Sequence, residues 1–238
     1  MTLFRILTLF FALSNQLSQA SCFEQLNEFL DQFKITPFHV LEDGVLRTNK
    51  HTHTVSIIDD LLIEVYSEDQ IKLIAKAVYP QGLKRRRAFI SRLKEQFKKG
   101  ERKISLRLLA PEAVGELTNK APRCDGPNCF NATLKWFYPD KELAETHSIE
   151  MDNYLRTHFK EIKPGKRLQF GDVLVWRDPQ GELVHTAIYI NENFSWHKAT
   201  YSETSSWVFE KTIAINMMYG IDSPNHALIA AFRHKPRW

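Results

Sequence analysis

The sequence predicts an α+β protein whose C-terminal half packs a short helix on an antiparallel sheet. A helical pattern of apolar residues begins at Cys129, directly after a Gly-Pro turn, and three strand-like segments follow between residues 170 and 198. In residues 21–118, apolar residues recur at spacings of three and four, so we expect this region to be mostly helical. Within it, the apolar run at residues 57–63 fits either a helix or a strand. The sequence therefore divides into a helical N-terminal region and an α+β domain over residues 119–238.

The first 20 residues have the three-part pattern of an export signal: a basic start, an apolar stretch at residues 6–13, and small residues Ser18 and Ala20. The apolar stretch is too short to cross a bilayer, which takes about 20 residues. We therefore expect residues 1–20 to be a signal peptide and the protein to be exported, periplasmic or extracellular. A buried N-terminal helix is the alternative, and lipid attachment at Cys22 stays open.

Composition indicates a folded protein with no preference for nucleic acid, because 43% of its 238 residues are hydrophobic and the formal net charge is only +4. Positive charge gathers in residues 84–107, where Phe89 and Leu93 recur at helical spacing. We interpret this stretch as a solvated helix face over a core stripe. The alternative is adhesion to an anionic envelope polymer or a membrane surface.

Three cysteines remain after removal of the signal: Cys22, Cys124 and Cys129. An odd number in an exported protein indicates one free thiol. A Cys22–Cys124 disulfide would leave Cys129 free, whereas a Cys124–Cys129 bridge would remove that thiol, and spacing alone does not decide. No second pair of ligands is spaced to complete a zinc site with these cysteines, so we expect no metal or other cofactor. His51 and His53 suit a surface loop.

Cys129 is predicted to lie in the first turn of a short helix. Asn128 is a good N-cap, Phe130 and Leu134 share one face, and Pro139 marks the end. The positive end of a helix favours a thiolate, and its free N–H groups can hold an oxyanion. A buried structural cysteine is the alternative interpretation.

Two histidines are predicted to be neighbours on one strand face. Residues 183–190 and 194–198 read as strands joined by a turn at 191–193. That turn places Ala187 opposite His197, and side chains alternate along a strand, so His185 lies diagonal to His197 on the same face. This is the arrangement of a general base with an orienting partner.

These motifs together resemble the NlpC-type papain-like cysteine hydrolases. The shared features are a Cys at a helix start, a strand opening with Gly171-Asp172, a His-x-x-Ile-Tyr-Ile strand and a polar residue twelve positions after its His. The resemblance covers residues 119–238. It implies that Cys129 is the nucleophile, His185 the general base and His197 the orienting residue, with the thiol facing the ring of His185. Many members cleave amide bonds in peptidoglycan stem peptides, so a peptide or peptidoglycan is the implied substrate.

The sequence departs from that family's motif on both sides of the nucleophile. Asn128 replaces the usual Asp before the Cys, and Phe130 and Asn131 replace the usual small residues after it. A second function therefore stays open, that of a non-catalytic protein which binds the cell envelope and carries a degenerate hydrolase domain. The oligomeric state and the role of residues 21–118 do not follow from the sequence.

Overall fold

The structure is a computed structural model. It describes residues 27, 29–32, 41–43, 47–48, 56–57, 60–78, 83–105, 107, 110–118, 128–138, 146–199, 206–220 and 228–235. The predicted signal peptide, the pairing or lipidation of Cys22, Cys124 and the two histidines at 51 and 53 lie outside these residues.

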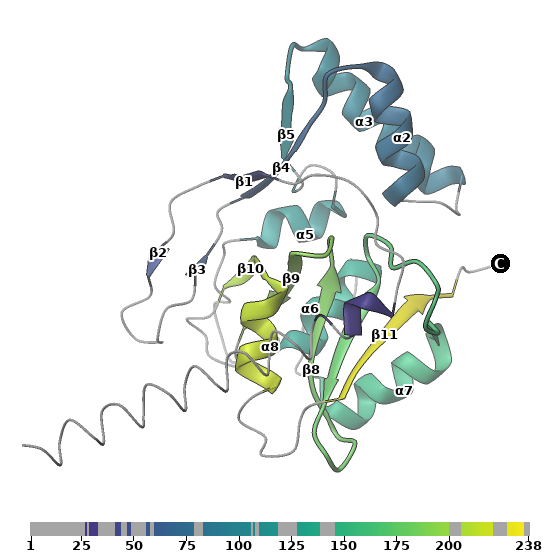
Figure 1. Cartoon of the computed structure of the whole chain (residues 1–238), viewed down its shortest axis with the longest axis vertical. Coiled ribbons are helices and arrows are strands. Elements are labelled where there is room, and N and C mark those ends of the chain that lie inside the picture. Colours follow the sequence, from purple (N-terminus) through teal and green to yellow (C-terminus); the bar gives the residue numbers. More distant parts are fainter. Residues whose placement is uncertain are drawn as a thin grey trace, which may run out of the picture.

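A six-stranded antiparallel sheet organises the C-terminal half, with strand order β10-β9-β8-β7-β11-β6 (Figure 1). Its strands are β6 (Phe159–Glu161), β7 (Val173–Arg177), β8 (Leu183–Tyr189), β9 (Phe194–Lys198), β10 (Trp207–Lys211) and β11 (Leu228–His234). The three strands expected between residues 170 and 198 are all present. Together with the helices around it, this sheet confirms the predicted α+β class.

Four helices accompany the sheet: α5 (Glu112–Leu117), α6 (Cys129–Phe137), α7 (Ser148–His158) and α8 (Thr212–Gly220). Helix α6 packs against β8 and β9, whereas α8 continues directly from β10. None of the helices in the described part of the chain is long and apolar enough to cross a membrane.

The N-terminal region contains strands as well as helices. Strands β1 (Leu41–Asp43), β4 (Asp60–Glu64) and β5 (Lys103–Ser105) form an antiparallel sheet, and β2 (Arg47–Thr48) pairs with β3 (Ser56–Ile57). Helices α2 (Glu68–Val78) and α3 (Leu83–Lys98) lie beside β5 (Figure 1). The spacing of apolar residues thus underestimated the strand content, because short strands carry too few residues to show a period of two.

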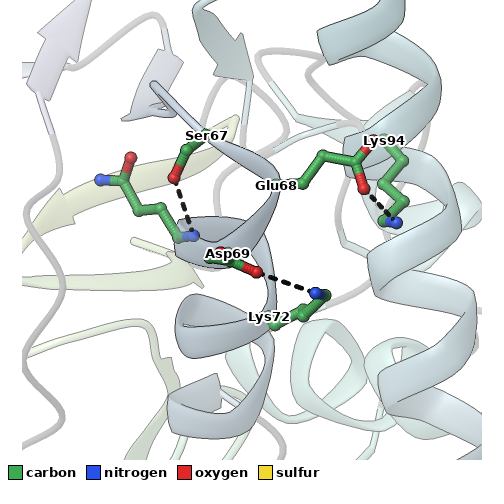
Figure 2. A network of polar contacts seen from close by, with 6 residues as sticks. Ser67, Glu68, Asp69, Lys72 and Lys94 are labelled. Atoms are coloured by element: carbon green, nitrogen blue, oxygen red, sulfur yellow. Dashed lines mark hydrogen bonds and ion pairs between the residues drawn. The ribbon is translucent and has the colours of Figure 1, made fainter.

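Hydrogen bonds between side chains and the backbone fix the start of helix α2. The hydroxyl of Ser67 accepts a hydrogen bond from the backbone N–H of Gln70 at 3.2 Å (Figure 2). The Gln70 side chain accepts one from the backbone N–H of Tyr66 at 2.8 Å. Lys94 of α3 donates to Glu68 at 2.5 Å and so links the two helices. In α3, Phe89 and Leu93 are buried, as a core stripe under a solvated face predicts.

The six-stranded sheet separates two apolar cores. We call one side the thiol face; its core contains residues of α6 together with Val173, Val175, Ile188 and Trp196, and extends to α2 and α3. We call the other side the histidine face; its core contains Leu174, Trp176, Ala187, Ile215 of α8, and residues 29–30. The alternation of neighbouring residues between the two cores follows from the pleat of the strands.

Candidate functional site

The start of α6 is fixed by a buried side-chain network. The Asn128 carboxamide oxygen accepts hydrogen bonds from the backbone N–H groups of Phe130 at 3.0 Å and Asn131 at 3.1 Å. Asn131 accepts in return from the backbone N–H of Asn128 at 3.1 Å, which completes a capping box. The Asn128 amide also donates to the carbonyl of Thr146 at 2.7 Å. The predicted N-cap is confirmed, and Cys129 lies in the first turn.

The Cys129 thiol is free and buried. A Cys124–Cys129 bridge is therefore not formed. Burial raises the pKa of this thiol to about 12. The backbone N–H groups of Thr186 and Phe130 and the ammonium of Lys198 lower the pKa, but by less. The N–H groups expected at a helix start are thus present, but in this enclosed position desolvation outweighs them and the thiol form is favoured.

The predicted register of β8 and β9 is confirmed. Ile188 lies opposite Trp196 and Tyr189 opposite Ser195, which extends to the expected pairing of Ala187 with His197. The two histidines accordingly meet: Nε2 of His185 lies 3.0 Å from Nδ1 of His197, and both side chains are fully buried.

A third residue extends the two histidines to a buried chain of hydrogen bonds, which we call the relay. Nε2 of His197 lies 2.7 Å from Oε2 of Glu210 on β10, and Glu210 is also buried. A carboxylate only accepts, so Nε2–H of His197 donates to Glu210. If Nδ1 of His197 carries no proton, it accepts from Nε2–H of His185, and the lone pair of His185 lies on Nδ1. That Nδ1 atom has no hydrogen-bond partner in the described part of the chain.

Glu210 was missed by the sequence analysis, although a signal for it exists. Strand β10 begins with three apolar residues, Trp207, Val208 and Phe209, and Glu210 follows them. A single carboxylate inside such a buried strand needs a partner, because an unpaired buried charge is strongly destabilising. Its partner, however, is a residue 13 positions away whose pairing depends on the strand order.

The ring of His185 is enclosed by aromatic side chains. It stacks on Tyr219 of α8 with ring centroids 3.8 Å apart, and Trp176 of β7 lies 5.6 Å away. Burial and, to a smaller extent, the charge of His197 hold the pKa of His185 well below its ordinary value. The ring is therefore neutral near pH 7, in the form in which a base accepts a proton.

The prediction that the Cys129 thiol faces the His185 ring is wrong. Thr186 points towards α6, where its hydroxyl lies 2.8 Å from that of Thr133 and 3.2 Å from the carbonyl oxygen of Cys129. Since His185 precedes Thr186 on the strand, its side chain points to the opposite face. Cys129 therefore belongs to the thiol face, and the relay belongs to the histidine face.

A β-bulge interrupts the alternation of β8 just before His185. Trp176 pairs with His185 and the next residue of β7, Arg177, pairs with Leu183, so Val184 is an extra residue on β8. Leu183 packs into the thiol-face core, whereas Val184 packs into the histidine-face core next to His185. The bulge thus shifts the alternation just before the catalytic candidate, which no period of two in the sequence predicts.

The charged side chain near Cys129 is that of Lys198, and not the predicted His185. It follows His197 on β9, so it points to the thiol face, and its side chain is buried. Burial lowers the pKa of Lys198, and the nearby Cys129 raises it.

Neither a metal site nor a relative helps to assign the site. The described residues contain no group of three histidine, cysteine or acidic side chains placed to hold a metal ion. Comparisons with protein families, curated proteins and solved structures found no match. The roles discussed below therefore rest on the geometry of this chain and on the motifs of its sequence.

Proposed function

We propose that the chain is an exported hydrolase of the papain-like NlpC type that cleaves an amide bond, with His185 as its general base. The observation that supports this proposal most strongly is the buried relay from Glu210 through His197 to His185. It leaves an acceptor nitrogen at one end and a carboxylate at the other, which is the arrangement that orients a histidine base in hydrolases.

The relay is difficult to explain by stability alone. Glu210 is 1% exposed, and its Oε1 has no hydrogen-bond partner among the described residues. Burying such a group is unfavourable, and an apolar set of side chains of the same volume would stabilise the fold at least as well. Buried titratable groups with a perturbed pKa, as His185 is, are concentrated at functional sites.

Cys129 is the nucleophile that the motif resemblance implies. In the proposed reaction, its sulfur forms a bond to the amide carbon while its proton passes to His185 and then to the leaving amine. Water then hydrolyses the thioester and restores the thiol. Because the thiol and the imidazole lie on opposite faces of the sheet, this reaction requires β8 and β9 to rearrange so that the two groups meet.

Cleavage of purified peptidoglycan and synthetic stem peptides, detected by mass spectrometry, tests the proposal. We expect His185→Ala to lose at least about a hundredfold in rate, as removal of a general base does. The matched control is His158→Ala, because His158 is an exposed histidine outside the relay. Full activity of His185→Ala would contradict the proposal. If Cys129→Ala keeps activity while His185→Ala loses it, His185 remains the base and a different nucleophile acts.

A second candidate function is favoured by the geometry of Cys129. A thiol with a pKa raised to about 12 and no contact with His185 suits a structural residue in a non-catalytic envelope-binding protein. Alkylation by iodoacetamide near neutral pH distinguishes the two functions. Slow modification of Cys129 in the folded protein, together with no cleavage of any stem peptide, supports the binding protein. Rapid modification, located by peptide mapping, supports the hydrolase.

A further inference from the structure

A cavity of about 570 Å³ lies at the end of the sheet formed by β11 and the edge strand β6. This volume is in the range of small-molecule sites. The relay occupies β8, β9 and β10, and β7 separates β8 from β11, so the two sites are distinct. Six cationic side chains line the cavity: Lys160, Lys163, Lys166, Arg167, Arg233 and Lys235. Glu161 is the only carboxylate among the lining residues.

Half of these cations are already used to hold the walls together. Arg233 makes a two-pronged ion pair with Asp172, at 2.9 Å from Nε to Oδ1 and 2.7 Å from Nη2 to Oδ2. Lys163 donates to Glu161 at 2.8 Å. Lys235 donates to the backbone carbonyls of residues 156 and 157, at 3.2 and 2.9 Å. These bonds fix the strand ends. The carboxylates of Asp172 and Glu161 neutralise Arg233 and Lys163, whereas Lys235 keeps its charge but has donors occupied by backbone carbonyls.

Three cations have both their charge and their hydrogen-bond donors available to a ligand. The side chains of Lys160, Lys166 and Arg167 are exposed and have no hydrogen-bond acceptor or ion-pair partner within the described ranges. The loop that carries two of them is held in place, because Arg233 donates to the carbonyl of Arg167 at 2.6 Å. Gly165 supports the turn with a φ of +78°, a conformation that other residues rarely adopt.

We propose that this cavity binds a phosphate group of a ligand, with Lys160, Lys166 and Arg167 as its charge partners. Three uncompensated positive charges match a dianionic or polyanionic group better than a single carboxylate. The guanidinium of Arg167 can donate two parallel hydrogen bonds to phosphate oxygens, and lysines add point charge. The inference does not depend on the hydrolase proposal, because no relay residue lines the cavity.

Isothermal titration calorimetry of the full mature chain at low ionic strength tests this site. The probes are inorganic pyrophosphate, a glycerol-phosphate polymer, and glutarate as a dicarboxylate of similar charge. We expect saturable binding of pyrophosphate, and a loss of affinity of at least about tenfold in the double variant K166Q/R167Q. Tighter binding of the polymer than of pyrophosphate would identify a polymer as the natural source of the phosphate.

The matched control is the double variant K99Q/K103Q, which removes two positive charges at the end of α3 and in β5, away from the cavity. It should change the affinity by less than about twofold, since diffuse surface charge is screened. Circular dichroism confirms that each variant folds, and Lys160→Gln replaces the double variant if that one does not. Equal losses in the control, binding of glutarate as tight as that of pyrophosphate, or no saturation with either phosphate probe would overturn the proposal. Lysines on an edge strand would then serve only to prevent strand pairing.

Discussion

The two faces of the six-stranded sheet are built differently around their polar groups. On the thiol face, Cys129 and Thr186 make local contacts in a core of apolar and small polar side chains that fixes the start of α6. On the histidine face, a chain of three titratable residues crosses β8, β9 and β10, and one acceptor nitrogen is left without a partner. Among the described residues, the thiol face also buries a titratable side chain, that of Lys198. The difference is that the titratable groups on the histidine face are joined by hydrogen bonds into a chain of three, an arrangement common at functional sites.

The largest expected effects come from the two tryptophans that anchor these faces. Trp176 donates from its indole N–H to Asn216 of α8 at 2.9 Å, and Trp196 donates to Thr118 at 3.0 Å; both are fully buried. We expect Trp176→Ala and Trp196→Ala each to lower the free energy of unfolding by about 3–5 kcal/mol in denaturant titrations. A loss below about 1 kcal/mol on either face would show that its core is not packed as described.

The pH dependence of stability separates the two faces. The pKa of His185 is lowered in the folded state, so below its ordinary pKa of about 6.5 the unfolded chain binds the extra proton and stability falls with falling pH. His185 contributes a slope of up to about 1.4 kcal/mol per pH unit to the free energy of unfolding. The variant His185→Gln should lack this slope in denaturant titrations between pH 4 and 7. His147→Gln, which replaces a histidine at an exposed site, is the matched control.

Asp172 contributes to the same pH range with the opposite sign. Burial raises the pKa of its carboxyl to about 6, although Arg233 acts against this, so its contribution to stability is complete at low pH and is lost as the pH rises through 6. Because Asp172 contributes in both proteins, the effect of His185 is the difference between the pH slopes of the unfolding free energy in the wild type and in His185→Gln. An unchanged slope in His185→Gln would contradict the description of a buried, neutral imidazole.

The smallest expected effect concerns the polar contact that joins α6 to the sheet. Thr186→Val keeps the side-chain volume and removes the hydrogen bonds to Thr133 and to the carbonyl oxygen of Cys129. We expect a loss of about 1 kcal/mol in the free energy of unfolding and no change in the slope assigned to His185. A changed slope would show that the two faces are coupled through β8.

The sequence predicted local features of the site better than its overall assembly. The Asn128 cap and the pairing of β8 with β9 follow from residues close in the chain, and both are confirmed. The contact of His185 with His197 follows from that pairing. By contrast, which face of the sheet α6 covers is decided by the assembly of distant segments, and it leaves no periodic signal in the sequence.

The same distinction explains the other errors. Glu210 belongs to the relay only because β10 lies next to β9, and strand order is a long-range property. The strands of the N-terminal region are two to five residues long, too short to be distinguished from helix by apolar spacing. A site that combines residues of three strands therefore becomes visible only in the folded chain.

The central claim is that the relay makes Nδ1 of His185 a proton acceptor. Nitrogen-15 NMR of histidine-labelled protein near pH 7 measures this directly, because protonated and unprotonated ring nitrogens have clearly different chemical shifts. We predict protonated Nε2 atoms in both His185 and His197 and an unprotonated Nδ1 in His185, with Glu210→Gln altering the His197 signals first. A proton on Nδ1 of His185 together with a bare Nε2 would contradict the relay and the general-base role built on it.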